Sequence, residues 1–240
     1  MRPLAPWLRW WLRDPAEAGA FRLAAVYMRR DKDVRHRLYP SLAMVIVFPL
    51  YFLFSSRASH GESVFYVYMC LWMLATLPLS TTETLRLSQD WQAADLFYYA
   101  PLEGHGPLFH GVRKAALYYA TLPCAVLLMV MLALVAPDPV ATFRNAIPML
   151  ILLPSFSLRG GMSREYLPLA RPPRTGEQSR GTQGPILLMM FLLPFFMGAI
   201  YLLIRAIGYW PLLAIEVPLT ILIHRMILRS MRRARPICAD

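Results

Sequence analysis

The chain has 240 residues, of which 57% are hydrophobic and 16% charged, and its net charge is +11. A soluble domain usually carries about 25% charged residues, whereas the apolar residues here gather in blocks long enough to cross a bilayer. The basic residues lie in the gaps between those blocks, as Lys and Arg do in membrane proteins, so the charge does not call for a nucleic-acid partner. Composition therefore excludes an ordinary soluble domain and predicts an all-α polytopic membrane protein.

The N-terminal segment, residues 1–37, is predicted to be cytoplasmic or to lie at the membrane interface. Apolar residues recur at helical spacing between Phe21 and Met28, and arginines occupy the other face. This pattern is typical of an amphipathic helix that lies along a membrane. We expect it to lead into the first span.

Residues 38–228 are predicted to form a single transmembrane domain with about six helices. A straight span needs about 20 residues, with a range of about 17 to 25. The fourth block is the shortest and contains Pro148 and Pro154. It reaches this length only if the polar residues from Thr142 onward are included. The predicted spans are 38–54, 63–81, 115–136, 142–158, 185–205 and 209–228.

The basic residues predict the orientation of these spans. With six crossings and both termini in the cytoplasm, 22 of the 25 Lys and Arg residues lie on the cytoplasmic side, and the exceptions are Arg57, Arg144 and Arg205. Such an excess follows the positive-inside rule. This distribution requires the fourth block to cross the membrane, since otherwise the Arg-rich tail at 229–240 would lie outside the cytoplasm. The loops 82–114 and 159–184 are then cytoplasmic.

The cytoplasmic loop at 82–114 contains a predicted short helix. Trp91, Ala94 and Tyr98 fall at helical spacing, and Pro101 ends the pattern. The helix could lie on lipid, or it could dock a cytoplasmic partner. Acidic residues are repelled by anionic headgroups, which favours docking slightly. The predicted docking residues are Asp90, Trp91, Ala94, Asp95, Phe97, Tyr98 and Tyr99.

An ion pair is predicted inside the membrane. Glu216 lies in the sixth apolar block, and Arg205 lies shortly before the turn at 209–211, so the two residues reach similar depth on an antiparallel hairpin. A charge in lipid is costly and is usually paired or functional. A structural pair near the outer interface is favoured over a role in substrate binding.

Motifs for enzymatic chemistry are missing from the sequence. There is no Gly-rich phosphate loop followed by Lys and Ser or Thr, no HExxH, no GxSxG and no CxxC. We therefore predict no catalytic residue, no metal site and no cofactor bound by this chain.

Two neighbouring segments resemble the membrane subunits of type-2 ABC exporters, the bacterial ABC transporter permeases. They are SQDWQAADLFYYAPL (Ser88–Leu102) and GVRKAALYYATLP (Gly111–Pro123). The resemblance implies an inner-membrane permease subunit that pairs with itself or with a similar chain. It also implies that a separate ATPase, which binds the ATP, contacts a coupling helix at about 88–100. The alternative is a non-transport membrane protein that recruits or assembles a cytoplasmic partner.

Overall fold

The computed structural model describes residues 6–12, 14–58, 63–88, 91–95, 97, 106–135, 138–158, 168–170, 199, 202–203 and 206–232. Within these ranges the regular elements are all helices, as the sequence predicts. They are α1 (Pro6–Trp11), α2 (Pro15–Arg30), α3 (Lys32–Ala58), α4 (Ser63–Thr84), η1 (Trp91–Asp95), α6 (Gly106–Ala116), η2 (Leu117–Thr121), α7 (Leu122–Val135), α8 (Pro139–Phe156) and α10 (Tyr209–Arg232).

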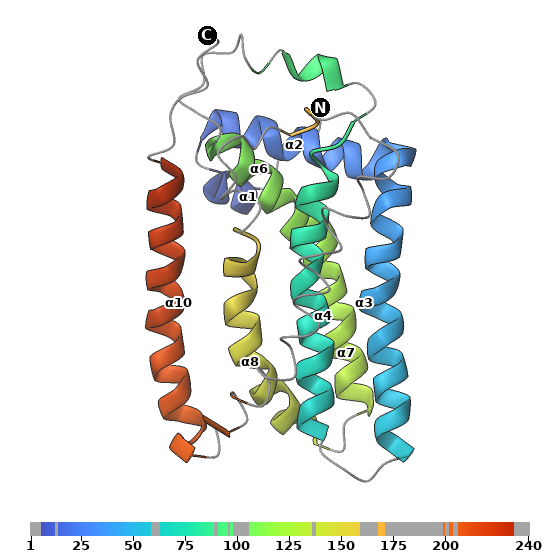
Figure 1. Ribbon diagram of the computed structural model, residues 1–240, viewed down its shortest axis with the longest axis vertical. Coiled ribbons are helices and arrows are strands. Elements are labelled where there is room, and N and C mark those ends of the chain that lie inside the picture. The colour runs from blue at the N-terminus through green and yellow to red at the C-terminus, as the bar shows by residue number, and fades with distance from the viewer. Residues whose placement is uncertain are drawn as a thin grey trace.

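Five helices, α3, α4, α7, α8 and α10, stand side by side as a bundle (Figure 1). In chain order α3 runs away from the α2 end, α4 returns, α7 runs away and α8 returns, and α10 also runs toward the α2 end (Figure 1). Helix α4 contacts α3, α7 and α8. Its Leu71 and Leu74 form the bundle core together with Leu128 and Leu132 of α7. Helix α4 is therefore the central element of the bundle.

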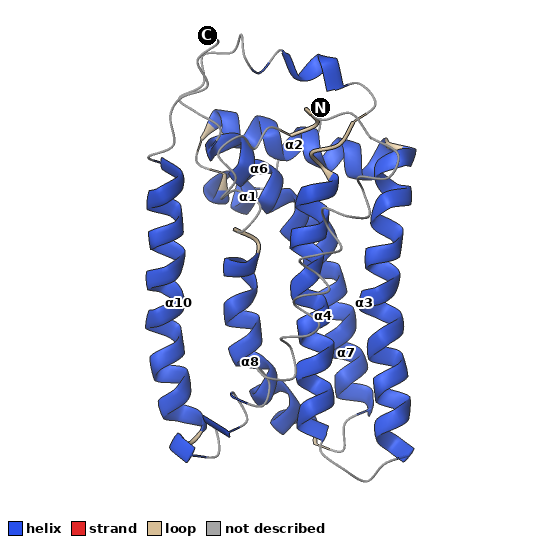
Figure 2. Cartoon of the chain, in the orientation of Figure 1, coloured by secondary structure: helices blue, strands red, loops and turns tan. Residues whose placement is uncertain are grey.

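Helices α1, α2 and α6 lie across one end of the bundle and form what we call the end layer (Figures 1 and 2). The apolar face predicted between Phe21 and Met28 is present in α2, where both residues are buried. Asp31 separates α2 from α3: its backbone N–H donates to the Tyr27 carbonyl at 3.0 Å, and its carboxylate accepts from the Asp33 N–H at 2.8 Å. One residue thus caps both helices and turns the chain from the layer into the bundle.

A π-helical segment, η2, joins α6 to α7. The Leu122 N–H donates to the Leu117 carbonyl, five residues back, and Pro123 follows directly. Proline has no N–H and its ring would clash with the carbonyl four residues before it in a regular α-helix. The wider π turn removes this conflict. The helix that contains the third predicted span thus begins at Gly106, earlier than the expected start at residue 115.

Two helices, Gly106–Leu134 and Tyr209–Arg229, are long and apolar enough to cross a membrane. Most of their surface is not buried by the rest of the chain, which argues against a soluble core and suggests membrane association. Exposed apolar side chains include Val126, Val130 and Leu134 on the first helix and Ile215, Leu219 and Leu222 on the second.

The other predicted spans correspond to the described helices to different degrees. Helices α3 and α4 cover the first and second predicted spans, and α3 extends beyond the first at both ends. Helix α8 covers the fourth predicted span except for its last two residues. Most of the fifth predicted span, 185–205, lies outside the described residues. The count of six spans stays a prediction.

Candidate functional site

The predicted docking segment is described at Ser88, 91–95 and Phe97, and its regular part is the 3₁₀ helix η1 rather than an α-helix. It is the short green turn beyond α2, on the side away from the bundle (Figure 1). Trp91 is 40% exposed, whereas Ala94 is only 4% exposed. Phe97 packs against the core of the end layer. Trp91 and Ala94 therefore do not share one exposed face, and Trp91 is the aromatic residue of the described segment that a partner can reach. The described residues do not include Asp90, Tyr98 or Tyr99, and the side chain of Asp95 is not described either.

The predicted intramembrane pair is described only at Glu216, because Arg205 lies outside the described residues. Glu216 is half-buried, and one of its carboxylate oxygens is buried without a hydrogen-bond partner among the described residues. Two turns earlier, the Tyr209 hydroxyl donates to the Arg144 carbonyl at 2.7 Å, and the Arg144 guanidinium lies 5.6 Å from the Tyr209 ring centroid. Tyr209 and Arg144 thus connect α10 to α8, while the Arg205–Glu216 pair stays a prediction.

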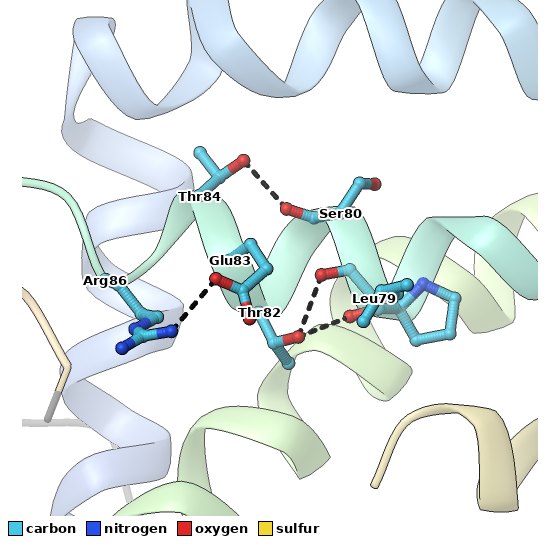
Figure 3. A network of polar contacts seen from close by, with 7 residues as sticks. Leu79, Ser80, Thr82, Glu83, Thr84 and Arg86 are labelled. Carbon is cyan, nitrogen blue, oxygen red and sulfur yellow. Dashed lines mark hydrogen bonds and ion pairs between the residues drawn. The ribbon is translucent and has the colours of Figure 1, made fainter. Parts of the chain in front are cut away.

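A run of hydroxyl residues ends α4 (Figure 3). The Thr81 hydroxyl donates to the Leu77 carbonyl at 2.8 Å, and the Thr84 hydroxyl donates to the Ser80 carbonyl at 2.8 Å. Such bonds to carbonyls of the preceding turn satisfy hydroxyl groups inside an apolar bundle. An ion pair of 3.2 Å between Glu83 and Arg86 follows at the layer end. The hydroxyl run therefore has a structural explanation that requires no ligand.

Helices α2 and α6 approach each other closely at Gly111. A Cβ atom placed there would lie 2.7 Å from the Ala20 Cβ and 2.9 Å from the Phe21 backbone nitrogen, and it would also meet the Glu17 carbonyl oxygen. Carbon atoms normally pack at about 3.5–4.0 Å. The two backbones are therefore in contact, and glycine is the residue that permits it.

Lys114 connects the three helices of the end layer. Its Nζ lies 2.7 Å from Glu17 Oε1 in α2, donates to the Trp11 carbonyl at 2.6 Å, and lies 5.3 Å from the centroid of the Trp11 ring. The side chains of Lys114 and Glu17 are 15% and 10% exposed. Charge-assisted hydrogen bonds of this kind are among the stronger polar contacts, and removal of one partner would leave a buried charge uncompensated.

Arg113 is the second cation of this crossing and is only 7% exposed. Its Nε and one terminal nitrogen are buried without a hydrogen-bond partner among the described residues. Three of the five guanidinium N–H groups therefore have no acceptor there. Glu17 and His224 of α10 are within electrostatic range. An unsatisfied buried donor costs about 1–3 kcal/mol, and more when it is charged. We call Glu17, Arg113, Lys114 and His224 the charged crossing.

The charged crossing was not predicted from the sequence, although Arg113 and Lys114 belong to the segment Gly111–Pro123 that carries the resemblance. One available signal was the spacing of Leu108, Val112 and Ala115, which is that of a helix with a buried face. Another was Glu17, an acidic residue in line with the apolar face of α2.

Comparison with known protein families, curated proteins and solved structures gives no match.

Proposed function

We propose that the chain is the membrane subunit of an ABC-type exporter in a bacterial inner membrane. It would pair with itself or with a similar chain and couple to a separate ATPase through the segment at about 88–100. The observation that carries the proposal is the position of η1, which lies beyond the end layer on the side away from the bundle (Figure 1), together with the exposure of its first residue, Trp91. A soluble protein could reach this aromatic residue without entering the membrane.

The course of the chain supports six spans with both termini in the cytoplasm. Helix α8 ends at the end layer, and α10 begins at the opposite end (Figure 1). The end of α8 and the start of α10 thus lie at opposite ends of the bundle, as they would if the span predicted at 185–205 crossed between them. The start of α3 and the end of α10 lie at the same end, which also carries exposed Arg22, Arg30 and Arg229. This distribution agrees with a cytoplasmic end layer.

A short connection links the docking segment to the centre of the bundle. Only residues 85–90 separate α4 from η1, and Leu85 and Ser88 of this stretch are buried. The Leu85 carbonyl also accepts a hydrogen bond of 2.9 Å from the Leu169 N–H, which belongs to the other cytoplasmic loop. A displacement of Trp91 would therefore reach α4, which contacts α3, α7 and α8.

The proposed mechanism divides the work between two proteins. The separate ATPase binds ATP and closes, and its movement pushes the docking segment. The paired membrane subunits then alternate their opening toward the two sides of the membrane. This chain supplies the docking contact and the path through the membrane, and it needs no catalytic residue of its own.

Co-purification tests the docking proposal. The proposal requires a neighbouring gene that encodes a phosphate-loop ATPase. The full chain is co-expressed with that ATPase, and complex formation and ATPase stimulation are measured. We expect the double substitution Trp91→Ala and Tyr98→Ala to weaken binding at least about tenfold, since aromatic anchors often dominate interfaces. The control is Trp210→Ala, because Trp210 is 72% exposed and belongs to the first turn of α10, which begins at the end of the bundle away from the end layer (Figure 1).

Two outcomes would redirect the proposal. If the complex and its stimulated ATPase activity survive the double substitution, the segment at 88–100 is not the docking site. If the double substitution abolishes binding of a soluble partner that has no ATPase activity, the chain is a membrane protein that recruits a partner without transport.

A further inference from the structure

The charged crossing carries more positive charge than its carboxylate balances. Glu17 faces two permanent cations, Lys114 at 2.7 Å and Arg113 within electrostatic range. Lys114 also has the Trp11 carbonyl as an acceptor, whereas three N–H groups of Arg113 have none among the described residues. A buried guanidinium in this state has the donors and the charge to bind an additional anion.

The position of Arg113 indicates from which side an anion would arrive. His224 of α10 is within electrostatic range, and Ile227 and Leu228 of the same helix pack against the core of the end layer. Arg113 thus lies between α6 and the C-terminal half of α10. Of the described side chains of α10, only that of Thr220 is buried, so this helix is held by few contacts and presents an apolar surface along most of its length.

Further basic residues lie in the C-terminal half of α10. Arg225 follows His224 directly in the sequence and Arg229 lies one turn further on, and both are exposed; this half of α10 is at the end of the bundle that carries the end layer. Basic sites between spanning helices on the cytoplasmic side are typical positions for anionic headgroups. The exposed apolar side chains of α10 would at the same time contact the acyl chains.

We propose that Arg113 binds the phosphate of an anionic phospholipid headgroup between α6 and the C-terminal half of α10. The guanidinium is planar and matches two phosphate oxygens with parallel N–H groups. The inference rests on the membrane topology given under the proposed function, but it requires neither the ATPase nor transport.

Native mass spectrometry of the full chain in detergent tests the site with defined lipids. The protein is offered equal amounts of phosphatidylglycerol and phosphatidylcholine. We expect the wild type to retain phosphatidylglycerol preferentially and Arg113→Gln to lower this preference about tenfold. The control Arg22→Gln removes an exposed arginine of α2 and should leave the preference unchanged. An unchanged preference in Arg113→Gln, or an equal loss in Arg22→Gln, would overturn the proposal.

A second measurement separates the lipid from a free anion. Millimolar inorganic phosphate is added to protein in phosphatidylcholine micelles, and the melting temperature is compared with that in phosphatidylglycerol micelles. Stabilisation by phosphatidylglycerol alone supports the lipid site, whereas equal stabilisation by inorganic phosphate contradicts it.

A conservative variant covers the case in which Arg113→Gln does not fold. Arg113→Lys keeps the charge and loses the planar fork, so it should lose part of the lipid preference, and full retention would count against guanidinium binding. All these measurements use the chain without the ATPase, so their failure leaves the docking test at Trp91 unaffected.

Discussion

Gly111→Ala should destabilise the protein although alanine is the better helix former. The new Cβ would lie 2.7 Å from the Ala20 Cβ and would also meet backbone atoms of α2, which no side-chain rotation can move. Since non-bonded carbon atoms prefer a separation of about 3.5–4.0 Å, α2 would have to move away from α6 by about 1 Å. That movement would lengthen the 2.7 Å contact between Lys114 and Glu17.

The magnitude follows from three contributions. Overpacking of this kind costs about 1–3 kcal/mol, and partial loss of a charged hydrogen bond adds up to about 1.5 kcal/mol. Replacement of glycine by alanine in a helix stabilises the helix by about 1 kcal/mol and offsets part of this loss. The free energy of unfolding should therefore fall by about 2 kcal/mol. Gly19→Ala is the matched control, because Gly19 lies within α2 and nothing stands within 4 Å of its added Cβ. It should raise stability by about 0.5–1 kcal/mol.

Both variants can be compared by denaturant unfolding in detergent, followed by tryptophan fluorescence and by size-exclusion profile. Opposite signs for the two glycines would agree with the contact between α2 and α6. A Gly111→Ala protein as stable as Gly19→Ala would refute the close packing of these helices.

Two other predictions concern the charged crossing and the orientation. Lys114→Met should destabilise by about 1–3 kcal/mol, because the buried Glu17 carboxylate loses its charged hydrogen-bond donor while Arg113 stays within electrostatic range; adding Glu17→Gln should recover little of this loss in the same unfolding assay, since buried Arg113 then lacks its counter-charge, and full recovery would argue against the coupling of Glu17 to Arg113. For topology, Val140→Cys, 78% exposed at the start of α8, should react with a membrane-impermeant maleimide in intact cells in a Cys238→Ser background. Arg22→Cys should react only after lysis, and labelling of intact cells at Arg22→Cys would reverse the proposed orientation.

Local periodicity was sufficient to predict α2. Its buried face repeats at helical spacing from Phe21 to Met28, and the acceptor Asp14 with Pro15 marks its first turn. The same reasoning missed α6, which begins at Gly106 inside the segment 82–114 expected to be a loop, although its Pro107 is favoured in the first turn of a helix. The pattern within one segment predicts the helix of that segment well. The predicted ends of the helix depend on which glycine and proline residues are taken to end it.

The contacts between distant segments could not be predicted in this way. Glu17 and Lys114 are far apart in the sequence, and nothing in either segment shows that Gly111 would bring α2 and α6 together. Trp91 and Ala94 were expected on one face, yet their exposures of 40% and 4% depend on what surrounds η1 rather than on their spacing. Helical spacing tells which residues share a face, and tertiary packing decides which face is covered.

The π-helical segment at Leu117–Thr121 fixes the rotational phase between two parts of one continuous helix. One residue corresponds to about 100° of rotation in an α-helix. The extra residue held in the π turn therefore sets which side of α7 faces the bundle when α6 is already fixed against α2 by Gly111. A single-residue deletion in this segment would turn the Leu128 and Leu132 side of α7 away from the bundle core, whereas substitutions there would keep the phase.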